Sequence, residues 1–299
     1  MDAHKKDMTG FRLSALGVLL LLLTACAREP ERHTPAQSAA PQRIVSLIPA
    51  VTETLFAVGA GSKVVGVSAF DTYPPDVERI TRVGGLVDPD TERILSLKPD
   101  LVFLYGSQEE LITQLKTAGV AIETYRHGGV AGIVESTRTV GARVGHAAEG
   151  EALATGIERA MATVKQRVGG APRPATLIVF GREDGALRGI YASGGVGFIH
   201  DMVEAAGGRN IFADIKRESV QASLESILER APEIILELRA PVVGRSEGWT
   251  VRQRDVWNAA PSLPAVRNGR VHVLLDERLV VPGPRVAGGI DLLARTIHQ

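Results

Sequence analysis

Two glycine-rich stretches have the residue types that nucleotide-binding loops use. Residues 195–200, GVGFIH, are expected to follow a strand and open a helix, as a dinucleotide-binding loop does, but His200 occupies the position of the third glycine. Residues 59–63, GAGSK, have the composition of a phosphate-binding loop, yet they are expected to end a helix and lack the Walker spacing. Neither stretch predicts a nucleotide site.

Other catalytic residue types are present without a catalytic arrangement. The chain contains no Gly-x-Ser-x-Gly sequence, so acyl transfer has no predicted nucleophile. Its 7 histidines are scattered, without His-x-His or Cys-x-x-Cys pairs, so the sequence predicts no directly coordinated metal and no cofactor. We therefore expect a protein that is not an enzyme. An enzyme on a two-lobed α/β scaffold, similar to a glycosyltransferase or a chelatase, remains the alternative.

An internal repeat is the most informative pattern in the chain. Residues 90–102, DTERILSLKPDLV, recur in similar form as residues 223–235, SLESILERAPEII. Each copy predicts a short helix with a polar N-cap, a glutamate in its first turn (Glu92 and Glu225) and an inward-facing Ile-Leu pair, followed by proline, an acid and a buried strand. Because a helix that leads into a strand is half of an α/β unit, two copies predict two similar lobes.

Apolar strands alternate with helices on both sides of a long helical stretch. Between residues 130 and 168 turn signals are few, and apolar residues recur at helical spacing in the second part. We expect residues 147–168 to form one stiff helix between the lobes. Because the strands are almost continuously apolar, we expect α/β lobes whose sheets are parallel and covered on both faces. The expected strands are 43–47, 64–68, 101–105, 121–125, 175–180, 189–192 and 271–275, and the other expected helices include 49–58, 108–118, 198–206 and 290–297.

Size, charge and composition exclude one large class of partner. The chain has 299 residues, 44% of them hydrophobic, which is enough for two domains with their own cores. Its 34 basic and 34 acidic residues cancel, so no net field attracts nucleic acid or an anionic membrane surface. Aromatic residues make up only 4%, which argues against a base-stacking surface. We expect no nucleic-acid partner.

The N-terminal region predicts export and a lipid anchor. A basic leader precedes an apolar core at residues 13–23, which is too short to cross roughly 30 Å of hydrocarbon as a helix. Residues 23–26, LTAC, are similar to the lipobox of bacterial lipoproteins, in which the cysteine is lipidated and becomes the new N-terminus. Cys26 is also the only cysteine, and a buried free thiol is the alternative interpretation.

These patterns divide the chain into five expected parts. The protein is expected to be a monomer that is held to a membrane by its lipid and faces the periplasm or the cell exterior. The parts are a lipoprotein signal peptide (1–26), a flexible tether (27–42), an N-terminal lobe (43–145), a bridging helix (146–170) and a C-terminal lobe (171–299).

Several further motifs resemble one family of transport proteins. They are SLIPAVTE at 46–53, VGVS at 65–68 with YPP at 73–75, ERIL at 92–95 with KPDLV at 98–102, AGGRNIF at 206–212 and VPGPR at 281–285. Together they resemble the periplasmic cobalamin-binding proteins and their iron–siderophore and haem relatives, the helical-backbone class of substrate-binding proteins of ABC importers. The resemblance implies two Rossmann-like lobes joined by one long inter-lobe α-helix, with a metal chelate bound in the cleft between them.

The resemblance also implies a docking surface for the transporter. In that family a surface glutamate on each lobe forms salt bridges with arginines of the two permease subunits, and the matching residues are Glu92 and Glu225. Charges at an exposed rim chiefly steer and register an encounter, so one acid per lobe suits a permease dimer with its ATPase subunits. The alternative is that both carboxylates only stabilise helix N-termini, each by about 0.3–1 kcal/mol. Glu53, also near a helix start, is interpreted mainly as a capping residue.

Residues near the ligand can be matched less completely. The cobalamin binder has a tryptophan six positions before each docking glutamate, whereas this chain has Leu86 and Ser219, so we expect an iron–siderophore or haem slightly ahead of cobalamin. Phe70 matches a ligand-facing aromatic residue, and Tyr73 lies in the same loop, with packing inside the lobe as the alternative. The remaining candidates, from loops expected to follow strands, are Tyr105, Arg126, His127, Arg182, Tyr191, Trp249 and Arg278.

The polar candidates have specific chemical roles to offer. Arg126, Arg182 and Arg278 could bind carboxylates or anionic siderophore oxygens, because a guanidinium recognises planar oxyanions, and solvated surface charge is the alternative. His127 could ligate haem iron axially, although a lone loop histidine is often a surface residue. Trp249 lies in a polar run and is expected to belong to a mobile lip over the cleft. The sequence thus predicts a substrate-binding lipoprotein of an ABC importer, with a surface lipoprotein that has no transport role as a further alternative.

Overall fold

The computed structural model describes residues 40–126, 128–241 and 247–299. The predicted signal peptide with Cys26, most of the tether, and His127 lie outside the described residues. Within the described ranges, none of the helices combines the length and the apolar character needed to cross a membrane.

The first sheet contains the predicted strands and one further short strand, β3, that was not predicted. Its strands are arranged in the order β3-β2-β1-β4-β5, and every neighbouring pair is parallel. Consecutive residues face opposite sides, so Ile44 and Phe103 join one hydrophobic cluster whereas Val45 and Val102 join another. Both faces are therefore buried. The strands are β1 (Ile44–Ser46), β2 (Val64–Val67), β3 (Thr81–Arg82), β4 (Leu101–Tyr105) and β5 (Ala121–Tyr125).

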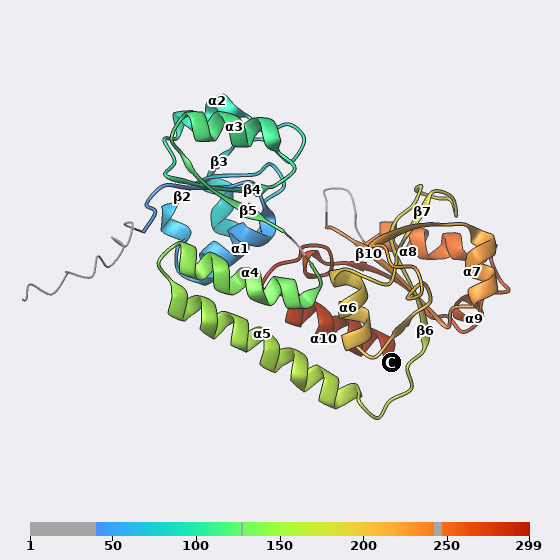
Figure 1. Ribbon diagram of the computed structural model, residues 1–299. Helices are drawn as coiled ribbons and strands as arrows, with labels where there is room; N and C mark the ends of the chain where they lie inside the picture. The colour runs from blue at the N-terminus through green and yellow to red at the C-terminus, as the bar shows by residue number, and fades with distance from the viewer. Residues whose placement is uncertain (1–39, 127, 242–246) are drawn as a thin grey trace, which may run out of the picture. The chain divides into compact units, whose positions relative to one another are not determined.

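Helices cover both faces of this sheet (Figure 1). Helix α1 (Pro49–Ala57) packs on the face of Ile44, while α2 (Thr91–Ser96) and α3 (Glu109–Thr117) pack on the face of Val45. All three helices begin within one residue of their predicted starts. Two short 3-10 helices, η1 (Gly61–Lys63) and η2 (Pro75–Arg79), complete this part of the chain.

The second sheet is mixed, which corrects the prediction of a wholly parallel one. Its order is β11-β10-β6-β7-β9, with β8 also paired to β6; β7 is antiparallel to both β6 and β9. Only residues 182–189 connect β6 to β7, and a parallel crossover needs a dozen residues or more, so this connection forms a hairpin. The strands are β6 (Ala175–Gly181), β7 (Ile190–Ser193), β8 (Arg209–Asn210), β9 (Ser219–Ala222), β10 (Ile234–Arg239) and β11 (Val271–Leu275).

The helices of the second sheet also form a layer on each face. Leu236 belongs to the cluster that contains α6 and α10 residues, whereas Ile235 belongs to the cluster that contains Ile227 of α7. Helix α10 begins earlier than predicted and contains Gly289, where a Cβ would come within 2.7 Å of the Arg278 carbonyl oxygen, so this close approach favours glycine inside the helix. The elements are α6 (Phe198–Ala205), α7 (Leu224–Arg230), α8 (Glu247–Asp255), η3 (Val256–Ala259), α9 (Pro264–Arg267), η4 (Glu277–Leu279) and α10 (Val286–Ile297).

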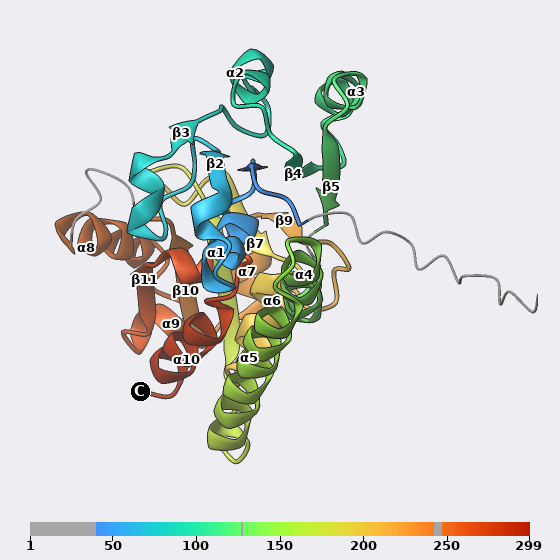
Figure 2. The same cartoon turned by 90° about the vertical axis from the view of Figure 1, so that its left-hand side faces the viewer.

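Helices α4 (Val130–Arg143) and α5 (Ala147–Val168) lie side by side, as both views show (Figures 1 and 2). A Cβ on Gly141 would lie 2.8 Å from the backbone of α5, so this close approach requires glycine. The helix pair packs against both sheets: Val140 of α4 joins a cluster of the first sheet, and Ile157 of α5 joins a cluster of the second.

Both copies of the repeat form the capped helix that their sequences predict. The Asp90 carboxylate accepts a hydrogen bond from the backbone N–H of Arg93 at 2.9 Å, and the Ser223 hydroxyl accepts one from Ser226 at 3.1 Å. These bonds satisfy N–H groups that a helix N-terminus leaves without intrahelical partners. The two helices, α2 and α7, are therefore held in the same local geometry.

Candidate functional site

The loop after β2 exposes aromatic side chains at one edge of the first sheet. The carboxyl ends of parallel strands meet at this edge, where α/β proteins usually bind ligands. Phe70 is 67% exposed and its ring lies over Gly85, where a Cβ would come within 2.7 Å of the ring. Tyr73 is exposed in the same loop, and Leu86 and Val87 are exposed in the next one. The predicted candidates Phe70 and Tyr73 thus belong to a surface that offers apolar contact.

A buried carboxylate belongs to the same loop, between Phe70 and Tyr73 in the sequence. Asp71 is only 2% exposed, and neither of its carboxylate oxygens has a hydrogen-bond partner among the described residues. Burial raises the pKa of Asp71; the hydroxyls of Thr52 and Ser68 lower it in part, although they do not meet hydrogen-bond geometry. Arg82 donates to the backbone oxygens of Ser68 and Asp71, at 3.0 and 2.7 Å, and so fixes the turn.

Two tyrosines are the last residues of the neighbouring strands β4 and β5. The rings of Tyr105 and Tyr125 meet edge to face with centroids 5.9 Å apart. Burial raises the pKa of Tyr125 to about 12, and burial together with the charge of Asp71 raises the pKa of Tyr105. Both phenols therefore stay protonated at neutral pH. The Tyr125 hydroxyl donates to the backbone oxygen of Pro282 at 3.3 Å, which brings the end of β5 to the segment that follows β11.

Arg285 joins several elements at the same place. Its guanidinium binds Glu53 of α1 through two hydrogen bonds, Nε–Oε2 at 2.9 Å and Nη2–Oε1 at 2.5 Å. Nη2 also donates to Glu277 at 3.2 Å, and the guanidinium carbon lies 3.9 Å from the centre of the Tyr73 ring. The Thr72 hydroxyl donates to the other oxygen of Glu277 at 2.5 Å. We call Glu53, Thr72, Tyr73, Glu277 and Arg285 the Arg285 cluster.

The structure corrects the interpretation of Glu53 as a capping residue. Helix α1 has no side-chain cap, and Glu53 is 4% exposed within the Arg285 cluster. Burial raises the pKa of Glu53, while the contact with Arg285 opposes the shift. Burial lowers the pKa of Arg285, but the contacts with Glu53 and Glu277 outweigh it and give a net increase, so we treat the pair as ionised.

A buried ion cluster is built around β10 of the second sheet. Glu237 of β10 is fully buried and accepts hydrogen bonds from Arg182 at 3.0 Å, from Arg239 at 2.7 Å and from the Trp257 indole N–H at 3.2 Å. Arg182 also donates to backbone oxygens, including that of Gln253 at 2.9 Å. Because the Arg182 side chain is fully buried and committed to these bonds, it is not available to a ligand.

The other candidates of the second sheet differ in exposure. Tyr191 is exposed on β7. Arg278 is partly exposed and pairs with Asp276 of its own turn at 2.6 Å. Trp249 is only 8% exposed and belongs to α8, which packs against β11, so its side chain is buried in the helix rather than exposed on a loop; that it belongs to a mobile lip stays a prediction.

The glycine-rich stretch at 195–200 forms one wall of an apolar pocket of about 230 Å³. As predicted, the stretch follows a strand, β7, and opens a helix, α6. Asn210 holds this loop by donating to the backbone oxygens of Ser193 and Gly194, at 3.1 and 2.8 Å. The residues that line the pocket are Phe180, Ser193, Val196, Gly197, Phe198, Ile199, Glu218 and Ser219.

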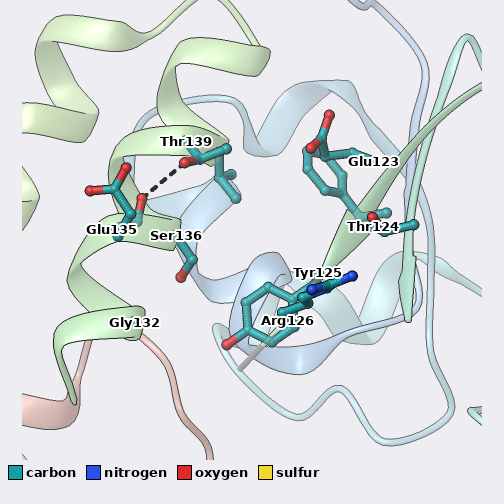
Figure 3. A pocket seen from close by; sticks show the side chains of 10 residues that line it. Glu123, Thr124, Tyr125, Arg126, Gly132, Glu135, Ser136 and Thr139 are labelled. Atoms are coloured by element: carbon teal, nitrogen blue, oxygen red, sulfur yellow. Dashed lines mark hydrogen bonds between the residues drawn. The ribbon is translucent and has the colours of Figure 1, made fainter. Parts of the chain in front are cut away.

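A second pocket, of about 250 Å³, lies between the end of β5 and helix α4 (Figure 3). The candidate Arg126 lines it together with Tyr125, and Glu123 and Glu135 supply acidic groups. Its hydroxyl groups are partly committed, since the Thr139 hydroxyl donates to the backbone oxygen of Glu135 at 3.1 Å. Among the described residues, no group of three or more His, Cys, Asp or Glu side chains is arranged to hold a metal ion.

The two repeat glutamates lie on the surface. Glu92 and Glu225 are both exposed, each in the first turn of its capped helix. Leu86 lies in the loop before the first copy, and Ser219 lies on β9 before the second. The sequence interpretation missed Asp71 and Arg285; the signal for Arg285 was its place in one of the motifs quoted above, VPGPR, while Glu53 ends another.

Two α/β sheets with helices on both faces, and exposed rings at their strand ends, define a binding protein with the periplasmic binding protein fold. The sequence pattern of the periplasmic binding protein family matches residues 44–277, and the chain belongs to this family. Its members are the substrate-binding proteins of ABC transporters, which are not enzymes.

The relatives agree with this assignment over most of the chain. An uncharacterized ABC transporter substrate-binding lipoprotein of Bacillus subtilis, YvrC, is 28% identical and aligns with 86% of this chain and 80% of its own. A cobalamin-binding protein of Halobacterium salinarum is 28% identical over 87% of this chain and 70% of its own. The solved apo structure of the periplasmic haem-binding protein RhuT of Roseiflexus has a TM-score of 0.73 at 28% identity, over 86% of this chain and 98% of that one.

Proposed function

We propose that this protein captures a metal chelate, an iron–siderophore or haem in preference to cobalamin, and delivers it to an ABC permease. The observation that carries the proposal is the exposed aromatic surface at the strand ends, with Phe70 and Tyr73 on the first sheet and Tyr191 on the second. Burying such rings against a large ligand is favourable, and exposed apolar surfaces of this kind often mark binding sites. The names of relatives, which include cobalamin-binding and haem-binding proteins, support a chelate as the ligand.

The ligand is proposed to lie between two lobes, residues 43–145 and 171–299, with the helix in 146–170 as the bridge. The packing of α4 and α5 against clusters of both sheets supports this division. A long helix between the lobes restricts their relative motion, so we expect small closure on binding, followed by release when the docked permease separates the lobes.

The set of ligand contacts can be narrowed by exposure and charge. Phe70, Tyr73, Tyr105 and Tyr191 remain as aromatic contacts, and the apolar pocket beside Ser219 would accept a ring or alkyl edge of the chelate. Arg126 and Arg278 remain as contacts for anionic oxygens. His127 remains a proposed axial ligand if the chelate is haem. Arg182 and Trp249 are left out because both are buried.

Glu92 and Glu225 are proposed to dock the two lobes on a permease dimer. Both are exposed and lie at equivalent positions of the two repeat helices. An acid on each lobe would suit arginines on two related subunits, because charge complementarity at a rim sets the register and speeds the encounter.

Cys26 is proposed to carry the lipid that anchors the exported protein as a monomer, facing the periplasm or the cell exterior. The lipobox-like residues before Cys26 support the anchor, and the relative YvrC is named a lipoprotein. Metabolic labelling with a palmitate analogue tests it: the wild-type chain should be labelled, whereas Cys26→Ser should not.

Isothermal titration of the protein with haem, cyanocobalamin and a panel of ferric siderophores tests the ligand class. We expect one class of chelate to bind with a Kd of about 1 μM or below. Phe70→Ala should weaken that binding, whereas Val251→Ala, which removes an exposed apolar side chain from α8, serves as the matched control. Failure of every chelate to bind would contradict the proposal. Turnover of a substrate with a metal or nucleotide requirement would support the enzyme alternative instead.

A further inference from the structure

The segment between β11 and α10 reaches elements of the first sheet at several points. Arg285 binds Glu53 of α1 and covers the Tyr73 ring, while Glu277 accepts from Thr72. The Pro282 backbone oxygen accepts from Tyr125, at the end of β5. The Arg285 cluster is the charged part of this contact, and it includes Thr72 and Tyr73 of the loop that also exposes Phe70.

We propose that Arg285 is a positioning residue, which fixes the orientation of the loop 68–73 and couples that loop to the segment after β11. The guanidinium is suited to this because its planar fork binds the Glu53 carboxylate through two bonds while its face stacks on the Tyr73 ring. No flexible lysine ammonium could meet both geometries together. The loop is thereby held by a side chain from the far end of the chain.

Because Glu53 is buried, loss of its contact with Arg285 would destabilise the folded protein. A carboxylate at 4% exposure needs a charged or hydrogen-bonding partner, and Arg285 supplies it from outside α1. Glu277 extends the contact, because one of its oxygens accepts from Arg285 and the other from Thr72. A ligand that displaces Tyr73 would therefore disturb the contacts of Arg285 with Glu53 and Glu277 as well.

The coupling can be measured without any ligand, by the distance between two spin labels. The chain has a single cysteine, so Cys26→Ser allows Glu78→Cys, in η2 after the loop, and Glu229→Cys, on α7, to be labelled selectively. Electron–electron double resonance should give a narrow distance distribution for this parent. Arg285→Gln should broaden it and add longer distances, and Arg285→Lys should have an intermediate effect.

Two controls separate positioning from general destabilisation. Arg295→Gln removes the same charge from α10, where Arg295 pairs with Asp291 one turn away, and should leave the distribution narrow. Glu53→Gln combined with Arg285→Gln removes the buried carboxylate together with its partly exposed partner, so it should fold more stably than Arg285→Gln alone and still give the broad distribution. A folded Arg285→Gln or double variant with the parent's distribution would overturn the proposal.

Binding of a ligand then tests whether the positioning by Arg285 matters for the proposed function. The inference rests on that function only because it treats the loop 68–73 as ligand-facing. Haem, followed by its absorption spectrum, is the probe. If the loop of Arg285→Gln is in its binding arrangement one-tenth of the time, haem binds about tenfold more weakly than to the parent. Absence of haem binding by the parent would count against haem as ligand, whereas an unchanged distance distribution counts against positioning by Arg285.

Discussion

Buried carboxylates lie near the strand ends of both sheets, Asp71 in the first and Glu237 in the second. Glu237 is held by Arg182, Arg239 and the Trp257 indole N–H. Asp71 has no hydrogen-bond partner among the described residues. The buried charges around Glu237 therefore pair with one another and hold the second sheet together. Asp71, in the exposed aromatic loop of the first sheet, has no such ion pair among the described residues.

The two repeat copies, in contrast, are closely alike. Each has an exposed glutamate in its first turn, and each ends with a left-handed residue before proline, Lys98 with φ of 48° and Ala231 with φ of 44°. The acid after that proline accepts from the backbone N–H of the neighbouring strand region: Asp100 binds Arg43 at 3.0 Å, and Glu233 binds Ala175 at 2.7 Å. The repeat thus fixes helix and strand as one unit in both sheets.

The largest effect is expected from reversing the charge of the exposed glutamate in both repeat copies. Glu92→Lys with Glu225→Lys should abolish uptake, because the loss of about 2 kcal/mol or more per site weakens docking by about a thousandfold in total. Uptake of the bound chelate into cells that lack the native protein is the measurement, with chelate affinity as the internal reference. If the copies are equivalent, the two single reversals should reduce uptake to a similar extent.

Charge reversals away from the repeat glutamates provide the matched comparison. Glu110→Lys on α3 and Glu229→Lys on α7 change exposed residues of the same charge and should leave uptake intact. Normal uptake by the double repeat variant would contradict the docking role, and Glu92 and Glu225 would then be helix-terminus residues only.

The difference between the buried carboxylates predicts opposite effects of neutralising them. Glu237→Gln leaves Arg182 and Arg239 buried without a countercharge, so it should lower the free energy of unfolding by about 3–5 kcal/mol. Urea unfolding followed by circular dichroism measures this. An unchanged midpoint would show that the arginines find other partners and that the second sheet does not depend on Glu237.

Local patterns in the sequence were sufficient for much of the fold. The N-caps and glutamates of the repeat, and the strands β1, β2, β4 and β5 of the first sheet, depend on neighbours within a few residues and were predicted, whereas the two-residue strand β3 was not. The antiparallel β7 depends on the length of one connection, which was available in the sequence but was not weighed. An acid inside the apolar strand IILELR was also a signal, because a buried Glu237 requires a basic partner and Arg182 supplies it.

The pairing of distant residues could not be predicted in the same way. Glu53 and Arg285 are 232 positions apart, and nothing within either motif names the other. Phe70 was chosen by family resemblance, and most other ligand candidates were chosen from loops expected to follow strands, a rule that points to one edge of a sheet but does not tell exposure. Tyr191 and Trp249 were equally eligible by this rule, and only the packing of α8 makes one exposed and the other buried.

Asp71→Asn should raise the free energy of unfolding, whereas Glu237→Gln should lower it. Burial raises the pKa of Asp71 above its ordinary value of 3.8, so its ionised form destabilises the folded state. Protonated Asp71 contributes stability that is fully present below pH 3.8 and is lost as the pH rises through the raised folded value. At pH 7 the variant should therefore gain about 1–2 kcal/mol over the wild type, and the gain should shrink as the pH is lowered. Thermal unfolding across this pH range measures it; a loss of stability at pH 7 would show that the Asp71 carboxylate has a partner after all.

The smallest effects on the free energy of unfolding are expected from removing the N-caps of the two repeat helices. Asp90→Ala and Ser223→Ala each remove one capping hydrogen bond and should each lower the free energy of unfolding by about 1 kcal/mol. Glu229→Ala, an exposed change on α7 outside the cap, should stay within about 0.5 kcal/mol of the wild type. Equal losses would mean that the two copies contribute alike to stability. A much larger loss from Ser223→Ala would mean that α7 depends on its own cap, whereas α2 is held by other contacts, such as the bond from the Arg43 guanidinium to the Leu97 carbonyl oxygen at its C-terminal end.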